Sequence, residues 1–401
     1  MSELTIDNAL LEKIIRKYKE DATVEVAAVD YKALGAKGGN YTSAIQRIVV
    51  KYTVEGDGDD AEKELSLFMK YLHIQESEAV TAMLQNVYQY EMGIMTEPLK
   101  HINQMLTVAY VPRLLYFHLE EPYFVILEDL MPLGFTMASR ATGLDLPHSL
   151  VAIRGLAEFH GSSVAVYEKM PEYRDTFKLS TLDDPNQAIY QLFNHGLISL
   201  ETAISGWEEL GPRYAEKLRS LRNVLFEKCK RAFGRRENEF TVLNHGDCTQ
   251  LNMLFAYDDN KKPTDVALVD FQMTAYNSPA VDLRTFMSSS VTQDVYQHHE
   301  YSLLEEYHSV LSETMKNLHC KTPIPSLEEI EKMYDDRAFI SVISTCIVYP
   351  IIHAPASDVL PLDDMLSDRS EDSGSRYEEK HFKELLIARL IEFDQRGLLE
   401  S

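Results

Sequence analysis

The sequence predicts an α+β fold in two parts, a small β-rich part followed by a larger, mostly helical part. Runs of β-branched and aromatic residues, separated by glycine-rich turns, are concentrated before residue 130. After residue 130, apolar residues recur at helical spacing over long stretches, with a short β-rich segment at residues 241–270. We therefore expect two lobes, residues 1–130 and residues 131–401.

The small part is expected to hold five strands and one main helix. We expect the chain to begin with an amphipathic helix, because charged residues lie between its apolar positions. The main helix, residues 76–105, follows the third strand. We expect the five strands to form an antiparallel sheet. In order, they are residues 24–33, 43–54, 65–72, 111–118 and 123–127.

The larger part is expected to be helical at residues 146–167 and 186–233, and again after residue 270. Its longest apolar run, residues 338–354, is somewhat short for a membrane span and contains Pro350. A buried core helix is the better interpretation of this run.

The composition of the 401 residues argues against several partners. The formal net charge is −24, so phosphate backbones and anionic membranes are repelled, and nucleic acid is a poor partner. The four cysteines form no CxxC pair, which suits a reducing compartment. The first residues do not resemble a secretory signal. We expect a cytoplasmic protein without a membrane span, and no protein partner is evident.

Two motifs in the β-rich segment carry the strongest functional signal. Residues 244–252 read NHGDCTQLN, and residues 268–272 read LVDFQ. Phosphoryl transfer needs positioning, charge neutralisation and an acceptor for the proton of the attacking hydroxyl. Asp247 can accept that proton, while Asn252 and Asp270 offer the hard oxygen ligands that Mg²⁺ prefers. Alternatively, these side chains cap two buried turns, which explains each residue alone but not their combination.

The spacing of these motifs matches the catalytic loop of kinases, in which Asp is followed by Asn five residues later and then by an Asp that precedes Phe. It indicates a bilobal protein-kinase-like fold that uses ATP and Mg²⁺. The acceptor would be a hydroxyl group of a small molecule.

A lysine and a glutamate in the small part have the order that a kinase requires. Lys70 lies inside the apolar strand LSLFMKYL, and Glu91 lies in the following helix. An ion pair between them would direct Lys70 at the phosphates of ATP. Alternatively, Lys70 lies on a solvated face of the sheet and Glu91 is one of many surface acids.

Two further segments are candidates for nucleotide binding. A glycine-rich turn between the first two strands offers backbone N–H groups to phosphates, although it matches no standard phosphate-binding motif. The end of the fifth strand would be the hinge, where backbone groups contact adenine. The expected contacts are Gly35, Gly38, Gly39, Asn40, Glu128 and Leu130.

His245 and Asp282 are better interpreted as structural supports of the catalytic loop than as a base and a metal ligand. His160, on a predicted helix, is interpreted as a core residue. The sequence contains no HExxH or GxSxG motif, so metalloprotease and serine-hydrolase functions have no support.

With these motifs the chain resembles the ecdysteroid-kinase-like family, also described as CHK-kinase-like, which is related to choline and aminoglycoside kinases. The resemblance runs nearly end to end. Its most diagnostic part is Asp-Phe-Gln at residues 270–272 in place of Asp-Phe-Gly. It also includes Gly39-Asn-Tyr with Arg47, the LEDL sequence ending at Leu130, and the segment from Ser278 to Asp282.

The resemblance implies an ATP- and Mg²⁺-dependent kinase, with family members that phosphorylate steroid hormones and dietary toxins. It would make Asp247 the catalytic base, Asn252 and Asp270 the metal ligands, and Lys70 with Glu91 the phosphate-positioning pair. The chain departs from the family where a Trp and an Asn are expected, since residues 248–251 are Cys-Thr-Gln-Leu. The acceptor is expected to be an ecdysteroid, another sterol or a xenobiotic.

Two other functions remain open at this point. A non-catalytic protein could retain the kinase fold to bind a small ligand, although none of the five key residues is missing. A protein kinase is disfavoured, because no Ala-Pro-Glu follows the Asp-Phe-Gln motif.

Overall fold

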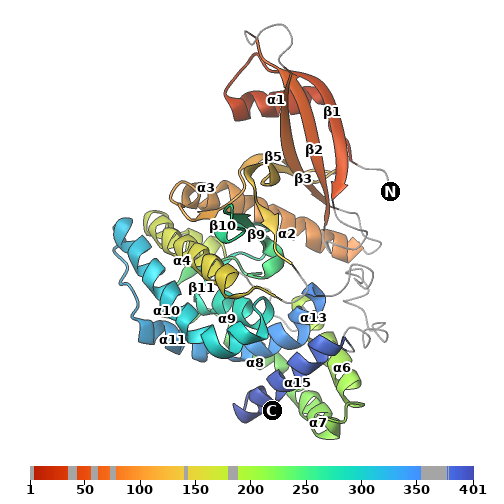
Figure 1. Cartoon of the computed structure of the whole chain (residues 1–401), viewed down its shortest axis with the longest axis vertical. Helices are drawn as coiled ribbons and strands as arrows, with labels where there is room; N and C mark the ends of the chain where they lie inside the picture. Colours follow the sequence, from red (N-terminus) through yellow and green to blue (C-terminus); the bar gives the residue numbers. More distant parts are fainter. Residues whose placement is uncertain are drawn as a thin grey trace.

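The computed structural model describes residues 4–34, 43–55, 62–72, 78–139, 143–178, 188–353, 377 and 379–401. Figure 1 shows an antiparallel sheet with few helices at one end and a mostly helical part at the other. This arrangement confirms the predicted fold class. The glycine-rich turn with Gly35, Gly38, Gly39 and Asn40 lies outside the described residues.

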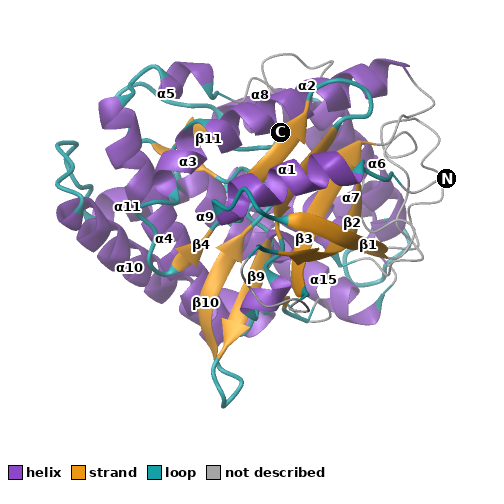
Figure 2. Cartoon of the chain, turned by 90° about the horizontal axis from the view of Figure 1, so that it is seen from above, coloured by secondary structure: helices purple, strands orange, loops and turns teal. Residues whose placement is uncertain are grey.

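The N-terminal sheet has five antiparallel strands in the order β1-β2-β3-β6-β5. They are β1 (Glu25–Leu34), β2 (Ser43–Thr53), β3 (Lys63–Leu72), β5 (Leu114–His118) and β6 (Phe124–Glu128). The helix α1 (Asn8–Lys19) lies across this sheet (Figure 2) and buries Leu11, Ile14 and Ile15. Their i, i+3, i+4 spacing places all three on one face of the helix.

Prolines divide two of the predicted elements. The helix expected at residues 76–105 is two helices, α2 (Glu78–Thr96) and α3 (Pro98–Ile102), because proline is tolerated only in a first helical turn. The strand expected at residues 111–118 begins at Leu114, after Pro112. Before that proline, β4 (Ala109–Tyr110) pairs in parallel with a strand of the second part.

Two small sheets hold the β-rich segment of the second part. One has the order β4-β10-β9-β7, and the other pairs β8 with β11. Their remaining strands are β7 (Thr136–Met137), β8 (Val242–Asn244), β9 (Met253–Tyr257), β10 (Pro263–Leu268) and β11 (Ala275–Asn277). The loop with Asp247 therefore joins β8 to β9, and Asp270 follows β10.

Helices make up most of the rest of the chain (Figures 1 and 2). The longer ones are α4 (Leu146–Lys169), α6 (Ala188–Ile204), α7 (Gly211–Arg222), α8 (Leu225–Phe233), α9 (Ala280–Ser289), α10 (Gln293–Asn317), α11 (Leu327–Asp335) and α15 (Lys380–Gln395). The shorter ones are α5 (Tyr173–Thr176), α12 (Phe339–Ile343), α13 (Tyr349–Ile352) and the 3₁₀ turns η1 (Met131–Leu133) and η2 (Gln250–Asn252). The described part of the predicted core helix, residues 338–353, is mostly buried, but a π-helical turn, η3 (Ser344–Val348), interrupts it.

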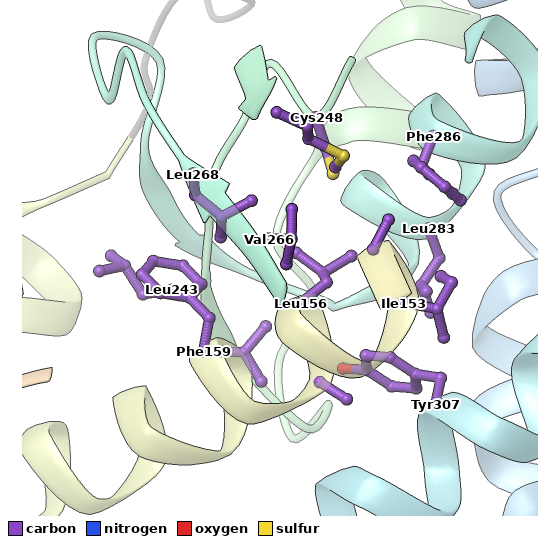
Figure 3. Close-up of a cluster of buried hydrophobic side chains, with 14 of the residues drawn as sticks. Ile153, Leu156, Phe159, Leu243, Cys248, Val266, Leu268, Leu283, Phe286 and Tyr307 are labelled. Carbon is purple, nitrogen blue, oxygen red and sulfur yellow. The ribbon is translucent and has the colours of Figure 1, made fainter. Parts of the chain in front are cut away.

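The centre of the second part is α4, whose residues from Val151 to Tyr167 are almost all buried. It packs between α10 on one side and the strands β8 and β10 on the other. Figure 3 shows this cluster, with apolar side chains of α4 against those of β8, β10, α9 and α10. Gly155 is required here, because a Cβ atom at this position would lie 2.2 Å from Val266. No helix among the described residues is long and apolar enough to cross a membrane.

Candidate active site

Lys70 joins the two parts of the molecule. It lies on β3, opposite Val125 of β6, and is only 7% exposed. Its Nζ lies 2.9 Å from Oε2 of Glu91 on α2 and 2.9 Å from Oδ1 of Asp270, which follows β10. Lys70 is therefore not on a solvated face, and it contacts two carboxylates, one from helix α2 and one from the segment after β10.

The two carboxylates keep Lys70 charged. Burial alone would lower the pKa of Lys70, but the negative charges of Asp270 and Glu91 outweigh burial and raise the pKa above its ordinary value. Burial raises the pKa of Glu91, and the ammonium group of Lys70 opposes that rise. The cluster thus presents a protonated lysine held in one orientation.

Asp247 and Asn252 are in direct contact within the loop between β8 and β9. The Asn252 Nδ2 atom donates to the backbone oxygen and to Oδ2 of Asp247, both at 2.9 Å. The turn η2 brings Asn252 back toward Asp247. Burial and the nearby charge of Asp270 raise the pKa of Asp247, while His245 and the Asn252 hydrogen bond lower it. The net shift is upward, which favours proton acceptance at higher pH than for an ordinary aspartate.

The backbone at Asp270 is left-handed, with φ of 68°. Aspartate tolerates this region better than most residues, and outliers of this kind often occur at active sites. The Val269 N–H donates to the Asn252 oxygen at 3.1 Å, which fixes the start of this turn against the loop between β8 and β9. One third of the Asp270 side chain is exposed, so its carboxylate is open to a ligand.

Asp282 holds the backbone of the loop between β8 and β9. It is fully buried, and its carboxylate accepts hydrogen bonds from the His245 N–H at 2.6 Å and the Gly246 N–H at 2.9 Å. His160 of α4 contacts the same carboxylate, with Nε2 3.1 Å from Oδ2. Burial lowers the pKa of His160, which favours its neutral form.

His245 supports the second motif. Its Nε2 lies 2.9 Å from the Val269 oxygen, and its ring packs on Phe271, with centroids 4.9 Å apart. Both contacts fix the segment that carries Asp270. Of the two residues expected to be structural, Asp282 therefore holds the loop backbone, including the N–H of His245, and the His245 ring contacts the second motif.

At the expected hinge, the side chain of Glu128 is used within the protein. Its carboxylate accepts from the Tyr18 hydroxyl of α1 at 3.0 Å and from the Tyr110 hydroxyl of β4 at 2.6 Å. The Leu130 oxygen accepts from Leu133 N and Phe135 N, at 3.1 and 3.2 Å. The Glu128 carboxylate thus connects α1 to the second part, and any contact with adenine would come from the backbone.

A family model described as the ecdysteroid kinase-like family matches residues 37–320. The chain belongs to the ecdysteroid kinase-like family. No matching sequence was found among curated proteins. The matched range contains the whole cluster from Lys70 to Asp282, whereas α1 and β1 lie before it.

In this ecdysteroid kinase-like protein, Asn252 and Asp270 are the residues that fit a Mg²⁺ ion. The described residues contain no group of three or more His, Cys, Asp and Glu side chains that could enclose a metal. An amide oxygen and one exposed carboxylate suit Mg²⁺ nevertheless, because Mg²⁺ takes most of its ligands from phosphates and water in nucleotide sites.

Sequence reasoning missed Asp129, which connects β2, β3 and the turn after β6 at the expected hinge. The buried Asp129 carboxylate accepts from Arg47 Nε of β2 and Ser66 Oγ of β3, both at 2.5 Å, and from the Met131 N–H at 3.1 Å. An acid directly after an apolar strand was visible in the sequence. Its partner Arg47 lies 82 residues earlier, and only sheet pairing brings the two side chains together.

Proposed function

We propose that this protein is an ATP- and Mg²⁺-dependent phosphotransferase that moves the γ-phosphoryl group of ATP to a hydroxyl group of a small molecule. The observation that carries the proposal is the contact of Lys70 with both Glu91 and Asp270. This contact joins the phosphate-positioning pair to a residue of the second motif, 200 residues away. A structural ion pair would need only one of these carboxylates to neutralise the lysine.

Each residue has a role in the proposed reaction. Asp247 orients the acceptor hydroxyl and takes its proton as the oxygen attacks phosphorus. Lys70, held by Glu91, contacts the α- and β-phosphates, and Asn252 with Asp270 would hold Mg²⁺. When bound, Mg²⁺ would neutralise phosphate charge. The raised pKa of Asp247 supports this role, because a base acts best when its pKa approaches the working pH.

The family and the connection after Asp270 both support a small acceptor. β11 ends at Asn277 and α9 begins at Ala280, so the chain leaves no room for an activation segment that would hold a peptide.

We propose an ecdysteroid, another sterol or a xenobiotic as the acceptor. We also propose a lobe boundary near residue 130 and a cytoplasmic location. The location is supported by the four free cysteines.

The function is tested by Mg²⁺-dependent ATP turnover of the purified protein with sterols, amino alcohols and plant phenolics, with mass spectrometry of the phosphorylated product. Asp247→Asn should lower turnover by at least about 100-fold, since it removes the proton acceptor. Asp259→Asn, in an exposed loop, is the matched control and should leave turnover unchanged.

Equal turnover in the wild type and Asp247→Asn would remove Asp247 from the mechanism. Binding of a compound from the panel without any turnover would instead favour a non-catalytic protein that retains the kinase fold to hold a ligand.

A further inference from the structure

A cavity of about 440 Å³ lies where the end of α4, the short helix α5 and the segment after α8 meet. α5 lies at the edge of the molecule in Figure 2. The residues that line the cavity are Tyr167, Glu168, Pro171, Arg174, Asp175 and Arg235. None of them belongs to the proposed phosphoryl-transfer site.

Arg174 is the unusual residue of this cavity. Its guanidinium lies over the ring of Tyr167, with Cζ 5.0 Å from the ring centroid, and its Nη2 donates to Thr241 Oγ1 at 3.3 Å. Its Nε is buried and has no hydrogen-bond partner. Throughout the described part of the chain, no carboxylate lies within ion-pair distance of Arg174. A buried donor without a partner is unfavourable, so the group is suited to an added acceptor.

The other charged groups of the cavity are already engaged. Arg235 donates from Nη2 to Asp175 at 3.1 Å and from Nη1 to the Arg174 oxygen at 2.7 Å. The carboxylate of Glu168 accepts from the N–H groups of Lys321 and Thr322, at 2.6 to 3.0 Å. Arg174 is therefore the charged residue of this cavity whose N–H donors remain available to a ligand.

We propose that this cavity binds a small oxyanion, a carboxylate or a phosphate group, through the guanidinium of Arg174. Arginine suits such ligands because its planar fork matches the two oxygens of a carboxylate or phosphate. The ring of Tyr167 packs against one face of the Arg174 guanidinium. Arg235 holds the backbone of α5 next to it.

The binding is tested by calorimetric titration of the full-length protein with inorganic phosphate and, separately, with succinate. The phosphate and succinate titrations distinguish the two oxyanion classes. For the oxyanion that binds, Arg174→Gln should weaken affinity by about tenfold or more, because it removes a charge-assisted hydrogen bond. Arg213→Gln is the matched control, since Arg213 is 69% exposed and lies outside the cavity.

Hydrogen exchange measured with the same oxyanion separates this cavity from the nucleotide site. With the oxyanion present, we expect slower amide exchange at residues 167–177 and 233–237 of the wild type. In Arg174→Gln, the oxyanion should not slow exchange at these residues. Arg174→Lys keeps the charge without the fork and should lose less affinity than Arg174→Gln, which keeps the test decisive if the glutamine variant does not fold. Equal affinity in the wild type and both Arg174 variants, or protection confined to Lys70 and Asp270, would overturn the proposal.

Discussion

At the scale of single residues, three acids in one small region have different environments. Asp282 is fully buried, and its carboxylate accepts from two backbone N–H groups. Asp270 pairs with Lys70 and remains one third exposed. The Asp247 carboxylate accepts from the Asn252 amide, and burial, together with the nearby charge of Asp270, raises its pKa. Of the three, Asp247 is therefore the acid most suited to exchange a proton.

The raised pKa of Asp247 predicts how stability responds to pH. A carboxyl whose folded pKa lies above its unfolded pKa destabilises the folded state as pH rises through the folded value. Asp247→Asn removes that unfavourable charge, so its free energy of unfolding at pH 7 should exceed that of the wild type. The gain should vanish as pH falls toward 3.8, the ordinary value. Urea denaturation at a series of pH values measures it, and a gain that grows at low pH would contradict the prediction.

At the scale of elements, the loop between β8 and β9, which carries the proposed base, depends on one tight turn. Gly246 has φ of 82°, and a Cβ atom there would lie 1.9 Å from the backbone oxygen of Met273. The same turn presents two N–H groups to Asp282. A residue with a side chain would have to push the loop away from the segment that carries Asp270.

Gly246→Ala should therefore lower the free energy of unfolding by more than about 2 kcal/mol, through backbone strain and steric overlap together. Gly134→Ala is the matched control, because Gly134 has φ of 89° but no atom within 4 Å of an added Cβ. It should cost only about 1 kcal/mol, the cost of a left-handed backbone. Thermal or urea denaturation compares the two, and equal losses would show that the contact with Met273 is unimportant.

At the scale of the whole molecule, two carboxylates connect the N-terminal sheet to the rest of the chain. Asp270 reaches Lys70 on β3, and Glu128 joins α1 to β4 through two tyrosine hydroxyls. The helix α1 lies before the residues that match the family model, yet it contacts the expected hinge. The N-terminal helix is thus connected to the end of β6 and to β4 through the Glu128 carboxylate.

Tyr18→Phe tests this connection. It removes one hydrogen bond to a charged group while keeping the ring, so the free energy of unfolding should fall by about 1 to 2 kcal/mol. Tyr301→Phe is the control, since Tyr301 is 46% exposed and its hydroxyl contacts a surface carboxylate. It should change stability by less than about 0.5 kcal/mol. Urea denaturation measures both variants, and equal effects would mean that α1 is not coupled to the hinge.

The sequence by itself determined the order of the elements and the residues of both motifs. Strand and helix patterns are local, so β-branched runs and apolar spacing predicted the five-stranded sheet and the helical part correctly. Pro98 and Pro112 shifted the ends of a predicted helix and a predicted strand. Proline restricts the backbone and removes an N–H donor, and this effect outweighs the apolar pattern around it.

Only the tertiary structure decided which groups meet. Lys70 and Asp270 are 200 residues apart, and nothing in either local sequence indicates their contact. The same holds for Glu128 with Tyr18, and for the left-handed turn at Asp270. Such contacts form because the strands pair and the two parts pack together, and packing depends on the whole chain rather than on neighbouring residues.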